Sequence, residues 1–288
     1  MQICKDLLTN SGKFCDLHTH TSFSDGSFTP TELISEAERC GLYAVALTDH
    51  NTPAGVPELC EAARLSRVKA ISGIEFSTDY RGTELHLVAL GVKEDKFPRV
   101  NALVEEVRER KRLAMDKLVS DLLAAGYSIE PERIYAGVQG IINRAHVATE
   151  LVRCGYAASR GDAFDRILYS GGPFYREPKY ISTEACIDFV NDIGAVSVLA
   201  HPLLNIDGQR LRELLGLTRG RLKAIEVLYS EYDGEQTALS ASLAEEFGLM
   251  PSGGSDFHGK NKPDIALGTG RGNLRIPLSF AENMGLLD

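Results

Sequence analysis

The sequence predicts an α/β fold whose strand–helix alternation is interrupted by a helical segment. Short apolar runs alternate with helix-like stretches over the first hundred residues, and the same alternation resumes after about Ser182. Strands that are separated by helices favour parallel pairing with crossover helices. A chain of 288 residues is long enough for one large domain with a smaller one embedded in it.

The first hundred residues contain the clearest predicted elements. A helix over 30–40 is indicated by Thr29 at its N-cap, Pro30 at its first position and Gly41 just past its end. Glu32 stands at the third helical position, where an acidic side chain is favoured. The predicted elements of this part are strands at 14–18 and 43–47, helices at 30–40 and 58–65, and apolar segments at 69–74 and 85–90.

The alternation stops after Pro98. Apolar residues recur at helical spacing from 100 to 125, and the exit from this region is the Gly/Pro-rich stretch 171–173. Strand-like runs then return at 196–199, 224–228 and 250–252. We therefore expect a barrel-forming part, residues 1–97 and 181–288, and a helical insertion, residues 98–180.

Composition excludes several classes of protein. The chain has 31 basic and 40 acidic residues and a net charge of −9, so bulk charge does not favour binding to long duplex DNA. Six scattered cysteines without CxxC spacing indicate reduced thiols. No apolar run approaches the ~18 residues that span a bilayer, and the N-terminus does not resemble a signal peptide. We expect a cytoplasmic protein that does not bind a membrane, with its oligomeric state left open.

Seven histidines are the most informative residues of the chain. Five of them lie at or just past the end of a strand-like run, usually beside an Asp, and a sixth lies inside such a run. In a barrel of parallel strands these ends converge on one face, where active sites collect. The six are His18, His20, His50, His86, His201 and His258.

Carboxylates accompany these histidines. Asp16, His18 and His20 alternate with period two and therefore share one face of an extended strand. Asp256 and His258 alternate in the same way after two glycines. Each motif alone is also compatible with a surface strand or a capping turn, but so many together favour a metal site.

Two further acidic residues complete the candidate set. Asp25 lies in a Ser-Asp-Gly turn, and Glu75 lies within an apolar run, where a buried carboxylate needs a partner. A tetrahedral zinc ion takes about four protein groups at most, so this set predicts two or three divalent ions with bridging carboxylates. The candidate ligands are His18, His20, Asp25, His50, Glu75, His86, His201, Asp256 and His258.

This mixture of ligands indicates both the metal and the reaction. Imidazole together with carboxylate favours manganese, iron or zinc over magnesium, and we expect manganese. Clustered divalent ions generate a hydroxide and stabilise both oxygens of an in-line phosphoryl displacement. The cations would also attract a phosphate to an otherwise acidic chain.

Taken in order, these motifs resemble those of the PHP (polymerase and histidinol phosphatase) domain family. The matching motifs are Asp-Leu-His-Thr-His, Ser-Asp-Gly, Thr-Asp-His, Gly-Ile-Glu, Ala-His-Pro and Ser-Asp-Phe-His, between Asp16 and His258. The resemblance implies a distorted (β/α)7 barrel with two or three metals at the C-terminal ends of its strands. It also implies that the nine candidates are the metal ligands. Asp16 and Asp49 would then be partners that orient these ligands without binding the metals themselves.

The insertion resembles that of one group within this family. Its Asn143-Arg144-Ala145-His146 segment is similar to that of stand-alone PHP phosphoesterases acting on 3′,5′-bisphosphonucleotides and on the 5′ ends of short RNAs. An Arg-x-His pair contacts the substrate phosphate in those enzymes, so Arg144 and His146 are the expected substrate contacts. Tyr175 and Arg176 are weaker candidates for stacking on, or pairing with, a nucleotide. The basic run 108–112 is interpreted as a solvated helix face.

The sequence thus predicts a metal-dependent phosphoesterase in which a metal-generated hydroxide attacks phosphorus. Arg144 holds the phosphate oxygens, and His146 or Asp256 protonates the leaving oxygen. The expected partner is a small phosphorylated nucleotide or a short single-stranded RNA. The alternatives are a histidinol phosphate phosphatase, a C–N hydrolase that also uses His-x-His in a barrel, and a non-catalytic nucleotide-binding protein with structural metals.

Overall fold

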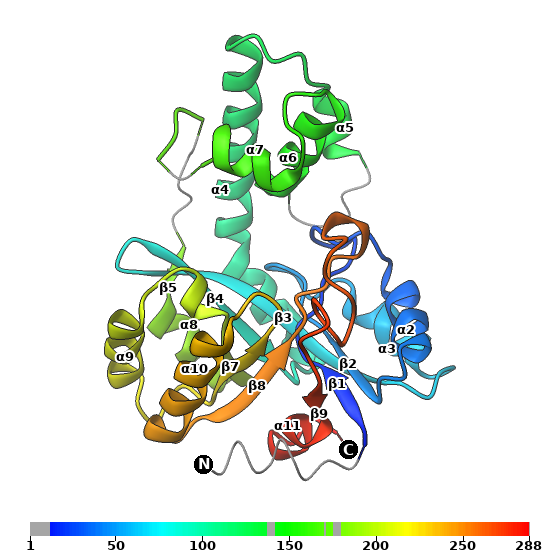
Figure 1. The fold of residues 1–288 in the computed structure, drawn as a ribbon, viewed down its shortest axis with the longest axis vertical. Coiled ribbons are helices and arrows are strands. Elements are labelled where there is room, and N and C mark those ends of the chain that lie inside the picture. Colours follow the sequence, from blue (N-terminus) through cyan, green and yellow to red (C-terminus); the bar gives the residue numbers. More distant parts are fainter. Residues whose placement is uncertain (1–11, 137–141, 170, 175–179, 288) are drawn as a thin grey trace.

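The structure of the chain is a computed structural model that describes residues 12–136, 142–169, 171–174 and 180–287 (Figure 1). Seven strands form its main sheet, in the order β8-β7-β6-β4-β3-β2-β1. Short strand β9 pairs with β1, and β5 pairs with β3. The strands are β1 (Phe14–Asp16), β2 (Ala44–Leu47), β3 (Lys69–Tyr80), β4 (Thr83–Leu90), β5 (Ile181–Ser182), β6 (Val196–Ala200), β7 (Ala224–Tyr229), β8 (Met250–Gly254) and β9 (Ile276–Pro277).

The sheet closes on itself where β8 meets β1. The Leu17 amide donates to the Gly253 carbonyl at 3.2 Å, and the His20 amide donates to the Phe257 carbonyl at 2.9 Å. Gly254 permits this close approach, because a side chain at that position would collide with Cβ of His18. The seven strands therefore form a distorted barrel, which confirms the predicted fold class.

Two pairings, both of β4, differ from the general expectation of parallel strands. β4 is antiparallel to both β3 and β6, although the alternation of strands and helices predicted parallel pairing. The reason is a two-residue turn at Arg81 and Gly82, both with positive φ (52° and 79°), which joins β3 directly to β4. Such a short connection can link only antiparallel neighbours. Since β4 runs in the opposite direction, its beginning lies at the end of the barrel where the parallel strands finish.

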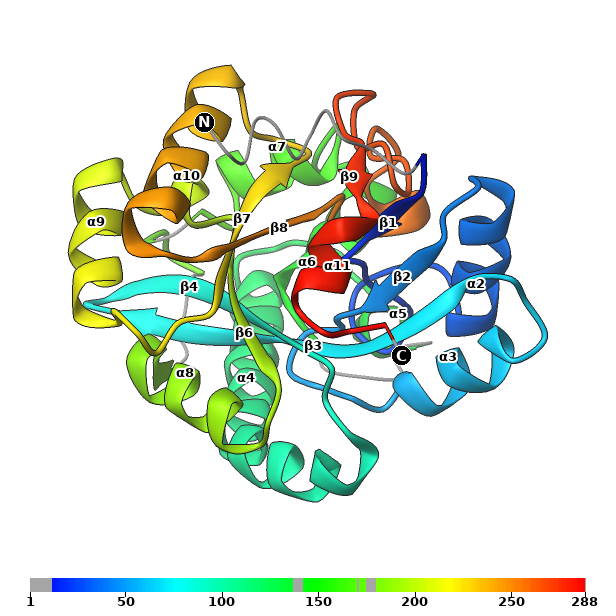
Figure 2. The same ribbon diagram turned by 90° about the horizontal axis from the view of Figure 1, so that it is seen from below.

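Helices surround the barrel (Figure 2). The predicted N-cap of α2 is confirmed, because Thr29 Oγ1 accepts from the Glu32 amide at 3.2 Å and the Glu32 carboxylate accepts from the Thr29 amide at 2.8 Å. Three short 3₁₀ turns, 94–96, 202–204 and 259–261, complete the connections. The surrounding helices are α2 (Pro30–Arg39), α3 (Val56–Ala63), α8 (Thr183–Asp192), α9 (Gly208–Leu217) and α10 (Gly234–Phe247).

The barrel interior is apolar at one end. α11 (Leu278–Asn283), for which the sequence analysis assigned no element, closes that end. Its Leu278 and Phe280 pack in one cluster with Ala44, Val88 and Val198 of the barrel strands. The opposite end of the barrel is polar and carries the candidate site.

The segment predicted to be helical stands above that polar end (Figure 1). The first half of the long helix α4 packs on the barrel through Val100 and Val104, whereas its second half packs through Leu118 against Val147 and Leu151 of α6. Among the described helices, none is long and apolar enough to cross a membrane. The helices of this segment are α4 (Phe97–Ala124), α5 (Pro131–Tyr135), α6 (Arg144–Arg153) and α7 (Arg160–Arg166).

Candidate metal centre

All nine candidate ligands lie together at the polar end of the barrel. The parallel strands deliver most of them at or just past their C-terminal ends, and β4 contributes its fourth residue because it runs the other way. The side chains form four overlapping groups, each with nitrogen and oxygen atoms within 4.8 Å of one another. The groups are His20–Asp25–His50–His258, His18–His20–Asp256, His18–Glu75–His201 and His50–Glu75–His86.

Glu75 is the centre of this cluster. Its carboxylate is fully buried and lies near five imidazole nitrogens. Burial disfavours its charged form, but the nearby His86, His18 and His50 outweigh this and hold the pKa of Glu75 well below its ordinary value. The nitrogens are Nδ1 of His86 at 2.8 Å and Nε2 of His201 at 3.1 Å from Oε1, and Nδ1 of His50 at 3.0 Å, Nε2 of His20 at 3.2 Å and Nε2 of His18 at 3.3 Å from Oε2.

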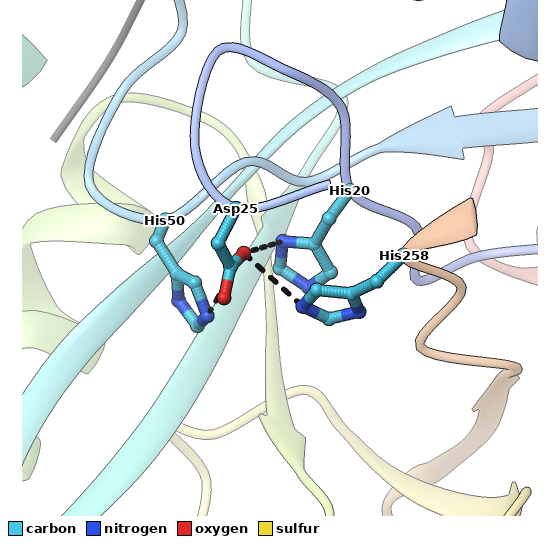
Figure 3. Close-up of side chains that lie close together, drawn as sticks. All are labelled: His20, Asp25, His50 and His258. Carbon is cyan, nitrogen blue, oxygen red and sulfur yellow. Dashed lines mark ion pairs between the residues drawn. The ribbon is translucent and has the colours of Figure 1, made fainter. Parts of the chain in front are cut away.

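Asp25 forms the second focus of the site (Figure 3). Its Oδ1 lies 3.1 Å from Nε2 of His258, and 3.9 Å from both Nδ1 of His20 and Nε2 of His50. Figure 3 shows these three rings pointing toward the carboxylate from different segments of the chain. Asp25 and Glu75 therefore share His20 and His50 between them.

Asp256 connects the cluster to a neighbouring lysine. Its Oδ1 lies 3.0 Å from Nε2 of His20, while its Oδ2 accepts from the Tyr229 hydroxyl at 2.9 Å and from the Lys262 ammonium at 2.6 Å. Burial opposes ionisation, but Lys262 and the histidines hold the pKa of Asp256 well below its ordinary value. Asp256 is therefore an ionised carboxylate with one oxygen directed at the cluster.

The backbone at this end of the barrel is strained. In the part of the chain that the structure describes, four non-glycine residues have positive φ, and three of them adjoin or belong to the cluster. Such conformations cost of order 1–3 kcal/mol each and persist where the surroundings impose them. The three are Asn51 at 50°, His201 at 28° and Asp256 at 57°.

The donor set fits divalent ions. Over the described residues, Oε2 of Glu75 and the Nδ1 atoms of His50 and His86 are buried without a hydrogen-bond partner. Nδ1 of His50 nevertheless lies only 3.0 Å from Oε2 of Glu75. Two atoms bound to one ion through bonds of about 2.0–2.2 Å lie about 2.8–3.6 Å apart in octahedral or tetrahedral geometry. These atoms thus have the spacing of ligands that face a shared cation.

Glu226 holds two candidate ligands and was missed by the sequence analysis. One of its oxygens lies 2.9 Å from Nδ1 of His18, and the other accepts from the His201 amide at 2.7 Å. Glu226 is buried in β7, within an otherwise apolar run. The same signal, a carboxylate in a buried strand, identified Glu75 and would have identified Glu226.

Asp16 and Asp49 lie behind the cluster but hold loops instead of imidazole rings. The Asp16 carboxylate accepts from the Ser255 amide and hydroxyl at 2.9 and 2.5 Å and from the Gly268 amide at 2.8 Å. The Asp49 carboxylate accepts from Thr21 and Ser24. Burial raises the pKa of Asp16 to about 6 and also raises that of Asp49.

A cavity of about 860 Å³ lies between the cluster and the helices above it. Asp25, His50 and His86 line its polar end. Its walls come largely from α4, α6 and α7 and their connections, and they contain both basic and apolar side chains. The wall residues include Lys111, Ala114, Met115, Ile142, Arg144 and Phe164.

The predicted substrate contacts occupy different positions. Arg144 lines the cavity, donates to the Leu168 carbonyl at 3.1 Å and lies over the Phe164 ring at 5.5 Å from its centroid. His146 packs behind the Asp25 loop, with Nε2 3.1 Å from the Ser24 carbonyl and Nδ1 2.9 Å from Oδ1 of Asn143. Tyr175 and Arg176 lie outside the described residues.

The basic run 108–112 was interpreted as a solvated face, and this is only partly correct. Arg112 is about half exposed and pairs with Glu109 and Asp116. Arg108 instead donates to the Asn51 carbonyl, and Lys111 is buried against Ser77. Successive residues of a helix are about 100° apart, so the run extends around α4, with Lys111 directed at the barrel and Arg112 about half exposed.

The chain is similar to several known proteins. The chain is 31% identical to a 5′-3′ exoribonuclease of Haemophilus influenzae, over 84% of this chain and 89% of that protein. It is 30% identical to a 3′,5′-nucleoside bisphosphate phosphatase of Chromobacterium violaceum, over 84% of this chain and 86% of that protein. A solved structure from Bifidobacterium adolescentis, described as a metal-dependent phosphoesterase, superposes with a TM-score of 0.83 at 27% identity, covering 96% of both chains.

These similarities confirm the prediction of a metal-dependent phosphoesterase. The family model described as PHP domain matches residues 16–168, a range that includes six of the nine candidate ligands and most of the helical segment above the barrel. The chain therefore belongs to the PHP domain family.

Proposed function

We propose that this chain hydrolyses phosphate esters of a nucleotide with neighbouring 3′ and 5′ phosphates. The substrate is a small 3′,5′-bisphosphonucleotide or the 5′ end of a short single-stranded RNA. The observation that carries the proposal is the convergence of six imidazoles and three carboxylates at one end of a cavity whose wall includes Lys111 and Arg144. The names of the Haemophilus and Chromobacterium relatives support this substrate class.

We assign the nine clustered side chains as the residues that would hold two or three divalent ions, and Glu75 belongs to two of the four groups. The mixture of imidazole and carboxylate supports manganese, with iron or zinc as alternatives. Bound ions of this kind supply Lewis acidity and a nucleophile at neutral pH.

Arg144 is the proposed phosphate contact of the insertion. Its guanidinium lies in the cavity wall at the first position of α6. A planar guanidinium matches two phosphate oxygens with parallel hydrogen bonds. The role of Arg144 would therefore be to orient the phosphate next to the cluster.

Asp256 and His146 are the two proposed proton donors to the leaving oxygen. The Oδ1 atom of Asp256 lies within the cluster, but this carboxylate is ionised there and would have to take up a proton before it could donate one. Nδ1 of His146 lies within hydrogen-bond distance of Asn143, and Nε2 lies within hydrogen-bond distance of the Ser24 carbonyl. His146 would therefore have to exchange one of these bonds for a bond to the substrate.

The experiment that tests the proposal uses purified protein loaded with manganese. We expect phosphate release from adenosine 3′,5′-bisphosphate and mononucleotide release from 5′-phosphorylated oligoribonucleotides, with histidinol phosphate and an amide substrate hydrolysed poorly. Preferred hydrolysis of histidinol phosphate or of the amide would overturn the substrate class. Tight nucleotide binding without turnover, with each of manganese, iron and zinc, would support a binding protein instead.

Two variants control this assay. His18→Ala removes a ligand from two of the four groups, so both bound metal and turnover should be lost. Arg144→Ala should keep normal metal content but lose about 10²–10³-fold in kcat, as expected when a donor to the reacting oxygens is removed. Loss of metal in Arg144→Ala would show that this residue belongs to the metal site.

A further inference from the structure

One of the three carboxylates of the cluster is paired with a lysine. Among the residues that the structure describes, the basic groups within 4 Å of the Asp25 and Glu75 carboxylates are imidazoles. Oδ2 of Asp256 instead accepts from the Lys262 ammonium at 2.6 Å. An imidazole is neutral when it binds a divalent ion, whereas an ammonium beside an ionised carboxylate keeps its charge. Asp256 is therefore paired with a permanent cation.

The loop that carries Lys262 is fixed by contacts on both sides. Lys262 follows the 3₁₀ turn 259–261. The residue before it, Asn261, donates through its side chain to the Asp25 carbonyl at 2.9 Å and accepts through its own carbonyl from Arg160 at 2.6 Å. Only 30% of the Lys262 side chain is exposed. The ammonium therefore has a defined place beside the cluster and differs from a solvated surface lysine.

The two oxygens of Asp256 face different partners. Oδ1 lies 3.0 Å from Nε2 of His20 and 3.7 Å from Nε2 of His18, so it is the oxygen that would hold an ion. Oδ2 accepts from Lys262 and from the Tyr229 hydroxyl. A single carboxylate would thus separate a divalent ion from the ammonium. Like charges at such short range repel, and the partial burial of the lysine limits screening by solvent.

We propose that Lys262 is a cation built into the metal centre, which holds Asp256 in place and weakens the binding of the ion that Asp256 helps to hold. This inference rests on the proposed function, in which the cluster holds divalent ions, and deepens it. The ammonium neutralises the buried carboxylate when that ion is absent, and the same charge opposes the ion when it binds. One ion of the centre should therefore exchange with solvent more readily than the others.

Manganese titration tests this charge effect. Electron paramagnetic resonance of free manganese gives the number of bound ions and the Kd of the most weakly bound one. In Lys262→Met this Kd should fall about 10- to 100-fold, because a like charge near the ion has been removed. Tyr229 still donates to Oδ2 in this variant, so Asp256 stays in place. Lys262→Gln should tighten binding in the same way, whereas Lys262→Arg keeps the charge and should bind manganese as wild type does.

Lys260→Met is the matched control. Lys260 is exposed and lies two residues before Lys262 in the same loop, where its backbone amide donates to the Ser27 hydroxyl. The substitution changes the net charge of the protein by the same amount, so a wild-type Kd in this variant would assign the effect to the position of the charge. Damage to the loop would weaken binding, so tighter binding separates a charge effect from a structural one.

Thermal unfolding gives a second readout that is independent of turnover. In chelator, Lys262→Met leaves the buried Asp256 carboxylate without its ammonium, so the Tm of this variant should lie below that of wild type. A tenfold lower Kd increases the stabilisation by manganese. At the same free manganese concentration, the rise in Tm should therefore exceed the rise in wild type by about 3–6 °C.

The two proposals fail in different ways. If wild type binds manganese but does not hydrolyse the bisphosphate, the proposed function is wrong and the role of Lys262 stands on the titration. If wild type binds no manganese, both are wrong. If wild type binds manganese, but Lys262→Met and Lys262→Gln show the wild-type Kd or a higher one, the role of Lys262 is wrong. Equal tightening in Lys260→Met would overturn it as well.

Discussion

Glu226 illustrates how one buried carboxylate orients two neighbours. One oxygen lies 2.9 Å from Nδ1 of His18, which selects the tautomer with hydrogen on Nδ1 and leaves Nε2 free to face the cluster. The other oxygen accepts from the His201 amide at 2.7 Å, at a residue with left-handed φ. Partners of this kind fix the ring orientation and basicity of a metal ligand.

The substitution Glu226→Gln tests this role. An amide keeps the shape of the side chain, but one of its two ends must now present NH₂ to a group that needs an acceptor. We expect metal affinity and turnover to fall about 10–100-fold, the usual effect of removing such a partner. Metal titration and kcat measurements would check this, with the exposed Glu235→Gln on α10 as control. Wild-type metal affinity in Glu226→Gln would contradict it.

At this scale, local pattern indicated residues that the structure brings together, and their role as ligands stays a prediction. Period-two alternation and positions at strand ends indicated His18, His20, Asp256 and His258, because these features depend only on neighbouring residues. Glu226 was missed although it carries the same local signal as Glu75, a single carboxylate within an apolar run. Lys111 could not be recognised, since its burial depends on how α4 packs above Ser77, a contact between residues 34 positions apart.

At the scale of elements, the helices above the barrel hold the loops that carry the candidate ligands. Arg108 on α4 donates twice to the Asn51 carbonyl, at 3.0 and 2.9 Å, directly after His50. His146 on α6 lies 3.1 Å from the Ser24 carbonyl, directly before Asp25. Arg160 on α7 donates to the Asn261 carbonyl at 2.6 Å, and the Asn261 side chain donates to the Asp25 carbonyl at 2.9 Å.

Arg108→Met tests whether these contacts support the site. The Asn51 carbonyl would lose both charged donors, and Asn51 already has a strained φ of 50°. Because Arg108 is partly exposed, we expect a loss of about 1–2 kcal/mol in the free energy of unfolding, together with weaker metal retention on dialysis. Arg112→Met, on the outer face of α4, is the control. Equal metal content and stability in the two variants would contradict a supporting role.

Elements with strong local signals were predicted best. The N-cap and the proline at the start of α2 are local features, and its observed bounds, Pro30–Arg39, differ from the predicted range by one residue. The β3–β4 hairpin was not predicted, because residues 76–82 (Phe-Ser-Thr-Asp-Tyr-Arg-Gly) do not continue the apolar run. β3 nevertheless extends to Tyr80, since pairing with β4 supplies backbone partners whatever the side chains are.

At the scale of the whole molecule, the interior of the barrel is apolar at one end and polar at the other. Its lower end is filled by an apolar cluster and closed by α11, whereas its upper end contains fully buried His18, His20 and Glu75. The sequence could not predict closure by α11, because that contact joins the end of the chain to strands from its whole length. The division at residues 98 and 180 stays a prediction, since α4 contributes to the cores on both sides.

Metal binding at the upper end should therefore stabilise the whole barrel. The candidate ligands come from segments between His18 and His258, so unfolding would disperse them and release any ions they hold. An ion that binds only the folded state at a hundred times its Kd adds about 2.7 kcal/mol to the free energy of unfolding. For a chain of this size, each kcal/mol raises Tm by about 2–4 °C, so we expect a rise of about 5–10 °C between chelated and manganese-saturated protein.

Thermal unfolding with chelator, followed by return of manganese, measures this shift, and His18→Ala should show a much smaller one. A Tm that is the same in chelator and in manganese would mean that the folded chain does not bind the ion, and the convergence of imidazoles and carboxylates would then need another explanation.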